Sequence, residues 1–220
     1  MLRRASPFQL LILDCDGVVV DSEPIVMRIL VEMLHELGVS IEAEEANERF
    51  IGTTFARTLE LIAQLVGGPV PDDFVPNYRD RTFAALETEL KPVPGIEAAL
   101  DQIAIPYCIA SNGPHAKMQR TLRITSLLPR FEGRMFSSAD VPRGKPHPDL
   151  FLHAARRCGT PPAACLVVED SASGIAAALA AGMSVHGFCG RAPEVRLRAA
   201  GAHGVFSRMS DLPALVTGIR

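Results

Sequence analysis

The chain has 220 residues, a formal net charge of -3 and 48% hydrophobic residues, so it is long enough to bury a substantial core. Lys and Arg are spread along the sequence without blocks, which argues against a nucleic-acid surface and a polybasic membrane patch. No apolar run reaches the ~18 residues of a membrane-spanning helix, so membrane insertion is not expected, and neither is secretion. The cysteines contain no CxxC pair and mostly lie in apolar runs, which predicts reduced thiols in a cytoplasmic protein.

The first predicted element is a strand at 8–13, an apolar run without polar alternation. The segment after it shows helical patterns and no strand. The first helical pattern starts at Pro24 and ends before Gly38. The others lie at 42–50, 53–66 and 72–86. The chain then continues through KPVPGI, whose two prolines predict a stiff connector.

Beyond the connector, short apolar runs alternate with helical patterns, as in parallel sheets covered on both faces. Further strands are predicted at 105–110, 165–168 and 184–188. Helices are predicted at 96–103, 115–124, 148–158, 172–181 and 193–200. We therefore expect an α/β fold, with a Rossmann-like doubly wound core domain at 1–20 and 89–220 and an inserted all-α subdomain at 21–88.

Polar and charged residues follow the predicted strands directly. Ligands of an open parallel sheet bind beyond the carboxyl ends of its strands, so these residues are expected at one edge. Together with a lysine from the PRGKPHPD loop, they are Asp14, Asp16, Ser111, Asn112, Lys145, Glu169 and Asp170. Any one of them alone also fits a turn or a helix cap. Their coincidence at strand ends favours a functional site.

The residue types at this edge predict its chemistry. Four carboxylates in one crevice repel one another unless a cation neutralises them, and Mg²⁺ suits a site with few carboxylates and a substrate phosphate. Ser111, Asn112 and the Lys145 ammonium are suited to an anion with several oxygens. We therefore expect a small-molecule phosphate ester as the partner, bound beside Mg²⁺.

Four segments resemble the motifs of the haloacid dehalogenase (HAD) superfamily of phosphohydrolases. DCDGVVVDSEP at 14–24 is similar to the first motif, Ser111 to the second, Lys145 in GKPHPD to the third, and Glu169 with Asp170 in VVEDSASG to the fourth. The resemblance covers essentially the whole chain. The helical insert is similar to the cap of the branch that contains phosphoglycolate phosphatases, β-phosphoglucomutases and sugar-phosphate phosphatases such as 6-phosphogluconate phosphatase.

The resemblance implies a two-step phosphoryl transfer. Asp14 would be the nucleophile that forms an aspartyl-phosphate, and Asp16 the general acid and base. Ser111, Asn112 and Lys145 would bind the phosphoryl oxygens. The implied enzyme is a phosphatase of a sugar phosphate, a sugar-acid phosphate or phosphoglycolate.

The resemblance also implies a ligand set for Mg²⁺. The ion would be held by the Asp14 carboxylate, the Asp16 carbonyl and Asp170, with Glu169 a ligand either directly or through water. We expect a monomer or a weak homodimer.

Three residues of the cap are candidates for substrate specificity: Glu23, Phe55 and Arg57. Glu23 equally fits a helix start, and Arg57 an exposed helix arginine. Where β-phosphoglucomutases carry a cap histidine this chain has Val26, and Phe55 takes the place of their cap arginine. Both differences favour a hydrolase over a mutase.

Two other functions fit part of the pattern. A sugar-phosphate mutase shares the motifs but must hold a second phosphate on the cap. A receiver-type phospho-acceptor domain also uses an Asp, an acidic pair and a Lys, but it needs only about 120 residues and no helical insert. The sequence leaves the identity of the phosphorylated metabolite open.

Overall fold

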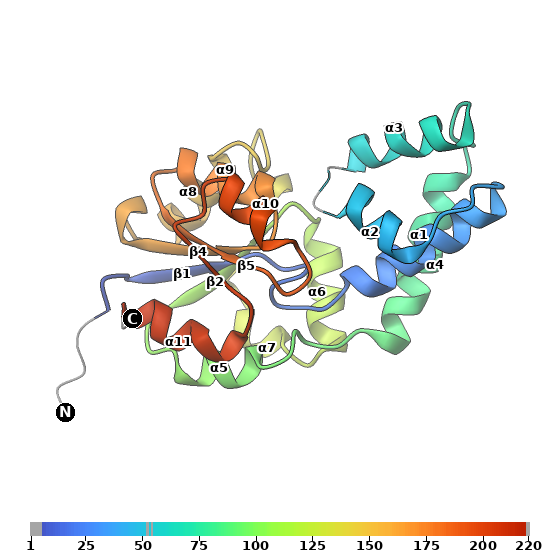
Figure 1. The fold of residues 1–220 in the computed structure, drawn as a ribbon. Coiled ribbons are helices and arrows are strands. Elements are labelled where there is room, and N and C mark those ends of the chain that lie inside the picture. Colours follow the sequence, from blue (N-terminus) through green and yellow to red (C-terminus); the bar gives the residue numbers. More distant parts are fainter. Residues whose placement is uncertain (1–5, 52, 54, 219–220) are drawn as a thin grey trace. The chain divides into compact units, whose positions relative to one another are not determined.

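The computed structural model describes residues 6–51, 53 and 55–218. Within these residues, six strands form one parallel sheet in the order β3-β2-β1-β4-β5-β6 (Figure 1). The strands are β1 (Leu10–Leu13), β2 (Tyr107–Ser111), β3 (Met135–Ser137), β4 (Cys165–Glu169), β5 (Ser184–Phe188) and β6 (Gly204–Phe206). This order places β1 and β4 side by side at the centre and confirms the predicted α/β, Rossmann-like fold.

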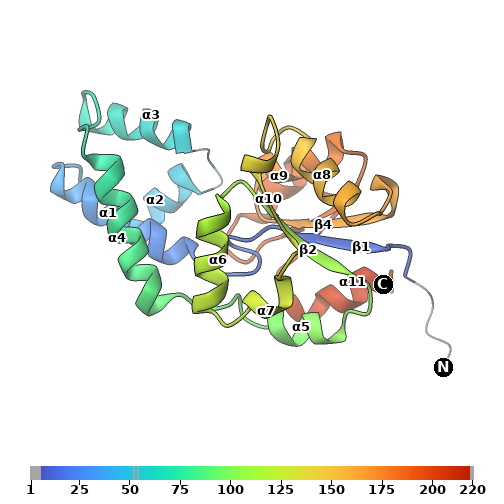
Figure 2. The same cartoon turned by 180° about the vertical axis from the view of Figure 1, so that it is seen from behind.

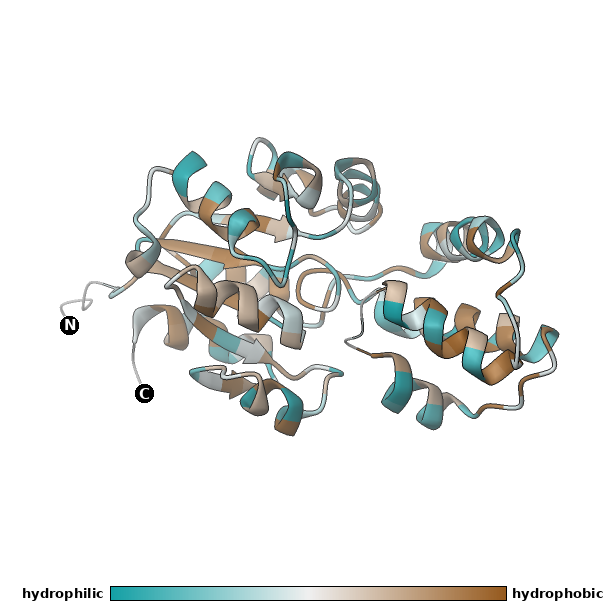
Figure 3. Cartoon of the chain, turned by 90° about the horizontal axis from the view of Figure 1, so that it is seen from above, coloured by the Kyte–Doolittle hydropathy of each residue, from teal (hydrophilic) through white to brown (hydrophobic). Residues whose placement is uncertain are grey.

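Helices cover both faces of the sheet, with α8, α9 and α10 on one face and α5, α7 and α11 on the other (Figures 1 and 2). The helices of this core are α5 (Ile96–Gln102), α6 (His115–Ile124), α7 (Leu128–Phe131), α8 (Asp149–Arg157), α9 (Ala172–Ala180), α10 (Glu194–Ala199) and α11 (Leu212–Thr217). Because both faces are covered, β1 is apolar throughout and β4 is apolar up to its last residue, Glu169, and Figure 3 shows the central strands largely in the hydrophobic colour.

The edge strands β3 and β6 are absent from the sequence-based prediction. Each has three residues, and each pairs with a neighbouring strand on one side, β3 with β2 and β6 with β5. Such short strands carry too few apolar residues to produce a recognisable run.

A separate compact unit spans Ser22–Leu90, while Met1–Asp21 and Lys91–Arg220 form the other. The helical subdomain was predicted at 21–88. Its helices are α1 (Glu23–Glu36), α2 (Ala43–Phe50), α3 (Phe55–Val66) and α4 (Phe74–Glu89), and they share an apolar core that includes Leu34, Ile62 and Phe74. None of the helices in the described ranges is both long and apolar enough to cross a membrane.

The two chain segments that lead into and out of the helical unit run beside each other. Val20 bridges Pro92 in an antiparallel pair, and the Asp21 amide donates to the Lys91 carbonyl at 2.9 Å. Arg191 adds an ion pair from its guanidinium to the Asp21 carboxylate at 2.9 Å.

Candidate active site

Asp14 lies at the carboxyl end of β1, in the middle of the sheet. Its amide donates to the Val168 carbonyl of β4 at 3.0 Å, which extends the β1–β4 pairing to Asp14 itself. The chain then turns after Asp16, because Gly17 adopts a left-handed conformation with φ +79° that glycine tolerates best. The buried apolar strand thus ends in two carboxylates at the sheet edge, as the sequence predicts.

A buried ammonium joins two of the predicted site residues. Lys145 Nζ donates to the Asp14 carboxylate, to Glu169 Oε1 at 2.5 Å and to the Ala110 carbonyl at 2.8 Å. The Lys145 and Glu169 side chains are 3% and 1% exposed. Such burial requires that each charge be paired, so the three groups form one electrostatic unit.

Glu169 uses both of its oxygens within the protein. Oε1 accepts from Lys145, and Oε2 accepts from the Ser171 amide at 3.1 Å and from the Ser171 hydroxyl at 2.8 Å. A Cβ at Gly174 would lie 1.9 Å from the Glu169 carboxyl carbon, so only glycine leaves room for the carboxylate. The structure therefore fixes Glu169 as the partner of Lys145.

Asp170 lies against the loop that follows β1. A Cβ on Gly17 would come within 1.8 Å of Asp170 Oδ2, so this carboxylate fills the space that a side chain at position 17 would take. Since β1 and β4 are adjacent, Asp170 and Asp14 end neighbouring strands. Among the described residues, no three His, Cys, Asp and Glu side chains are spaced as a metal site. A donor set of two carboxylates and a backbone carbonyl still suits Mg²⁺, which keeps several of its waters.

Ser111 ends β2 and Asn112 follows it directly. Ser111 is buried, and its hydroxyl accepts from the Gly113 amide at 3.1 Å. Asn112 Oδ1 accepts from the Lys145 amide at 2.9 Å, and its Nδ2 donates to the Lys145 carbonyl at 3.1 Å. The side chain of Asn112 thus holds the backbone of Lys145 in place. Its predicted role as a phosphate ligand stays a prediction.

Lys117 is a site residue that sequence reasoning missed. Its Nζ donates to Asp16 Oδ2 at 2.7 Å. Burial alone would lower the pKa of Lys117, but the charge and hydrogen bond of Asp16 outweigh it and raise that pKa. A lysine in the first turn of a helix opposes the helix dipole. This unfavourable position of Lys117 in α6 is the sequence feature that could have marked it as a site residue.

The electrostatics of the buried unit favour a proton on Asp14. Burial, together with the Glu169 and Asp16 charges, raises the pKa of Asp14 to about 7, against the opposing effect of the Lys145 ammonium. Burial would lower the pKa of Lys145, but Asp14 and Glu169 together raise it. A cation beside Asp14 would favour its ionised form, which is the nucleophilic one.

The three predicted specificity residues all lie in the helical unit. Glu23 begins α1 and is partly buried. Phe55 begins α3, is exposed, and stacks on the ring of Tyr78 at 6.2 Å between centroids. Arg57 forms an exposed ion pair with Glu60 at 2.7 Å. Their role toward a substrate stays a prediction.

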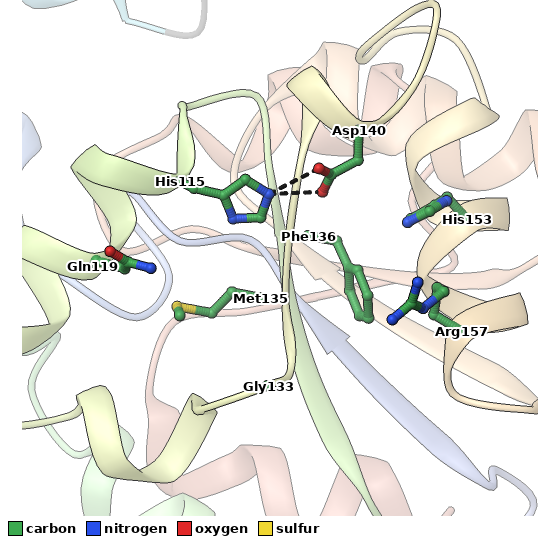
Figure 4. A pocket seen from close by; sticks show the side chains of 8 residues that line it. All are labelled: His115, Gln119, Gly133, Met135, Phe136, Asp140, His153 and Arg157. Carbon is green, nitrogen blue, oxygen red and sulfur yellow. Dashed lines mark hydrogen bonds and ion pairs between the residues drawn. The ribbon is translucent and has the colours of Figure 1, made fainter.

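A separate hollow of about 470 Å³ lies along the edge strand β3 (Figure 4). It is lined by His115, Gln119, Gly133, Met135, Phe136, Asp140, His153 and Arg157. His115 Nε2 contacts both carboxylate oxygens of Asp140 at 2.9 Å. Asp140 also caps the turn that begins at Ser137, and Ser138 of that turn donates to the Asn112 carbonyl at 2.8 Å. The hollow therefore lies next to the turn at 137–140, and this turn bonds to the Asn112 backbone through the Ser138 hydroxyl.

The chain is similar to known proteins in sequence. Residues 8–182 match the model of haloacid dehalogenase-like hydrolases. A 6-phosphogluconate phosphatase from Escherichia coli (strain K12) is 33% identical over 206 residues, which are 92% of this chain and 91% of that protein.

Two solved structures share the whole architecture. A haloacid dehalogenase-like protein of unknown function from Agrobacterium tumefaciens str. C58 has a TM-score of 0.90 at 38% identity, covering 96% of this chain and 99% of that one. A HAD family hydrolase from Deinococcus radiodurans R1 with bound phosphate and sodium has a TM-score of 0.82 at 30% identity, covering 98% of this chain and 97% of that one.

The family model spans most of the chain, and the 6-phosphogluconate phosphatase matches it over nearly its full length. The resemblance predicted from the four motifs is thereby confirmed, and so is the class of phosphoric monoester hydrolases. This chain belongs to the haloacid dehalogenase-like hydrolases and is a phosphatase of small phosphorylated metabolites.

Proposed function

We propose that this phosphatase hydrolyses a sugar phosphate, a sugar-acid phosphate or phosphoglycolate in the presence of Mg²⁺, by way of an aspartyl-phosphate on Asp14. The observation that carries the proposal is the buried contact between the Lys145 ammonium and the Asp14 carboxylate at the end of β1. A carboxylate in this position is oriented by the protein and lies next to a fixed positive charge that attracts a phosphate dianion.

The first step forms the bond between an Asp14 oxygen and phosphorus. The bond from phosphorus to the ester oxygen breaks, and Asp16 gives its proton to the leaving alkoxide. In the second step Asp16 takes a proton from water, whose oxygen attacks the phosphorus and releases phosphate from Asp14. Ser111 and Lys145 would neutralise the phosphoryl oxygens throughout.

Mg²⁺ would be held by the carboxylates of Asp14 and Asp170 and by the Asp16 carbonyl, a set of hard oxygen donors. When bound, the ion neutralises negative charge on the phosphoryl group. We assign Glu169 to the orientation of Lys145 instead of the metal, because its two oxygens already accept hydrogen bonds from Lys145 and Ser171.

Two features support hydrolysis of a sugar-acid or sugar phosphate over a mutase reaction. One is the similarity to a 6-phosphogluconate phosphatase over nearly the full length of both chains. The other is the presence of Val26 and Phe55 where a mutase cap carries histidine and arginine. A cytoplasmic location fits such a metabolite, since these phosphate esters are intracellular compounds.

The test is phosphate release from a panel that contains 6-phosphogluconate, phosphoglycolate and hexose phosphates, with Mg²⁺ and with EDTA. We expect one class of ester to be hydrolysed with a kcat/KM at least about tenfold above the others, and turnover to stop with EDTA and return with Mg²⁺. If EDTA did not change the rate of phosphate release, the reaction would not need a metal ion and this part of the proposal would be wrong. A requirement for a sugar bisphosphate activator, without phosphate release, would favour the mutase.

A further inference from the structure

The loop that follows β2 is held by the turn that follows β3. Ser111 and Ser137 pair in register and are the last residues of these two parallel strands, so both segments leave the sheet at the same edge. The turn is the short helical segment Ser138–Asp140. Its first hydroxyl, on Ser138, lies 2.8 Å from the Asn112 carbonyl oxygen. The serine is the donor in this bond, because a carbonyl oxygen only accepts.

A single peptide unit joins this contact to Ser111. The Asn112 carbonyl and the Gly113 amide belong to the same planar peptide bond, so a hydrogen bond that fixes the carbonyl also fixes the direction of the N–H. The Gly113 amide donates to the Ser111 hydroxyl oxygen at 3.1 Å. The hydrogen bonds therefore run in one direction, from the Ser138 hydroxyl through the peptide to the Ser111 oxygen.

The Ser111 hydroxyl keeps its own proton for another acceptor. A hydroxyl oxygen that accepts from an amide can still donate, and a chain of hydrogen bonds polarises each of its members. Ser111 is buried, and its strand β2 is the neighbour of β1, which leads into Asp14. In the mechanism proposed above, the acceptor at this edge is a phosphoryl oxygen.

The surroundings of Ser138 hold it in place. A Cβ at Gly144 would lie 2.9 Å from the Ser138 Cβ and 2.5 Å from Asn112 Oδ1, so the loop that contains Gly144 packs directly against both residues. The turn is also closed by its own last residue, because Asp140 Oδ2 accepts from the Ser137 amide at 2.8 Å. The Ser138 hydroxyl therefore has a defined position beside the Asn112 carbonyl.

The neighbouring Ser137 makes a similar contact with a different consequence. Its hydroxyl donates to the next carbonyl, that of Gly113, also at 2.8 Å. The peptide bond of this carbonyl leads to Pro114, whose nitrogen carries no proton. The contact of Ser137 therefore holds the loop but passes no hydrogen bond on, whereas that of Ser138 continues to Ser111.

We propose that Ser138 is a positioning residue of the phosphatase, which orients the Ser111 hydroxyl toward the phosphoryl group through the peptide between Asn112 and Gly113. The inference rests on the function proposed above, in which Ser111 neutralises a phosphoryl oxygen. It adds a residue that lies outside the four motifs and acts through Ser111. Because a preorganised donor stabilises the transition state of phosphoryl transfer, loss of the Ser138 hydroxyl lowers kcat more than it raises KM.

The test is a double-mutant cycle in the full chain with Mg²⁺, measured by phosphate release. The substrate is the ester with the highest kcat/KM among 6-phosphogluconate, phosphoglycolate and the hexose phosphates. We expect Ser111→Ala to lower kcat about a hundredfold, and Ser138→Ala to lower it about fivefold to tenfold with a change in KM of at most about twofold. The double variant should match Ser111→Ala within about twofold, because Ser138 acts through Ser111.

Controls separate this role from a structural one. Ser210→Ala removes an exposed hydroxyl from another short turn, Met209–Asp211, and should leave kcat unchanged. The melting temperature of Ser138→Ala should fall by no more than about 4 °C, the effect of one partly exposed hydrogen bond. A purely structural Ser138 would instead slow turnover by the same factor whether or not the Ser111 hydroxyl is present.

The outcomes distinguish the inference from the function on which it rests. Losses that multiply in the double variant, or an unchanged kcat in Ser138→Ala, would overturn the role of Ser138 and leave the phosphatase proposal intact. A normal kcat in Ser111→Ala would contradict the phosphate contact of Ser111, and the role of Ser138 with it. If no ester of the panel were hydrolysed, the proposed function itself would fail, together with the inference.

Discussion

Lys145 and Glu169 form a buried ion pair, with Nζ and Oε1 2.5 Å apart, and the same ammonium contacts Asp14. The sequence analysis assigned Glu169 and Asp170 together to the metal, and this ion pair gives Glu169 a different role. Glu169 and Asp170 are neighbours in the sequence, but the Glu169 carboxylate faces Lys145 while Asp170 lies against Gly17. Glu169 therefore pairs with a residue of the proposed phosphate site, whereas Asp170 belongs to the proposed metal site.

The two roles predict different metal dependence for two matched variants. Asp170→Asn should raise the Mg²⁺ concentration needed for half-maximal activity by about tenfold or more, because it removes a charged ligand. Glu169→Gln should lower kcat by about tenfold to a hundredfold, because Lys145 loses its countercharge, but it should leave the Mg²⁺ requirement unchanged. Phosphate release over a Mg²⁺ titration measures both. An equal shift of the Mg²⁺ requirement in the two variants would show that Glu169 is a ligand.

Asp14 makes a second prediction, in which activity and stability move in opposite directions. Asp14→Asn should abolish turnover, because an amide does not form the aspartyl-phosphate. The raised pKa of Asp14 means that its folded form holds a proton from about pH 4 to about pH 7, where the unfolded chain has released it. The protonation of Asp14 thus contributes to the free energy of unfolding at low pH, and this contribution is lost as pH rises through 7.

Without metal, Asp14→Asn should therefore be more stable than the wild type at pH 8, by a few kcal/mol, and the difference should shrink toward pH 5. Thermal melts in EDTA at both pH values measure this. Asp72→Asn, an exposed carboxylate of the helical unit, is the control for loss of charge alone. A variant less stable than the wild type at pH 8 would contradict the raised pKa, and residual turnover would contradict the nucleophile.

The parts of the molecule that the sequence predicted are those with a local signal. Central strands such as β1 and β4 are apolar because both faces are covered, and the site residues follow them directly. The short edge strands β3 and β6 gave no such signal. The contacts of Asn112 with the Lys145 backbone join residues 33 positions apart, and those of Lys117 with Asp16 join residues 101 apart. Such contacts depend on strand order and helix placement, which one sequence does not contain.

Lys117 provides the third prediction. Its ammonium lies 2.7 Å from the Asp16 carboxylate, and in the proposed mechanism this contact orients the carboxyl that gives its proton to the leaving oxygen. Lys117→Met should lower kcat/KM by about tenfold to a hundredfold, and Lys117→Arg should recover part of it, because arginine keeps the charge with altered geometry. Steady-state phosphate release measures the effect, with Arg156→Met, an exposed position on α8, as control. If Lys117→Met retained full kcat/KM, the contact with Asp16 would have no part in catalysis.

Arg57 provides the last prediction, because the helical unit contains a matched control. Arg57 pairs with Glu60 and Arg49 pairs with Glu45, both at 2.7 Å and both exposed. Exposed pairs of this kind contribute about 0–1 kcal/mol, so alanine at either position should change the melting temperature little. If Arg57 binds the substrate, Arg57→Ala should raise KM for the preferred sugar-acid phosphate about tenfold, while Arg49→Ala leaves it unchanged. Equal KM values in the two variants would make Arg57 an ordinary surface arginine and move the search for specificity to Glu23 and Phe55.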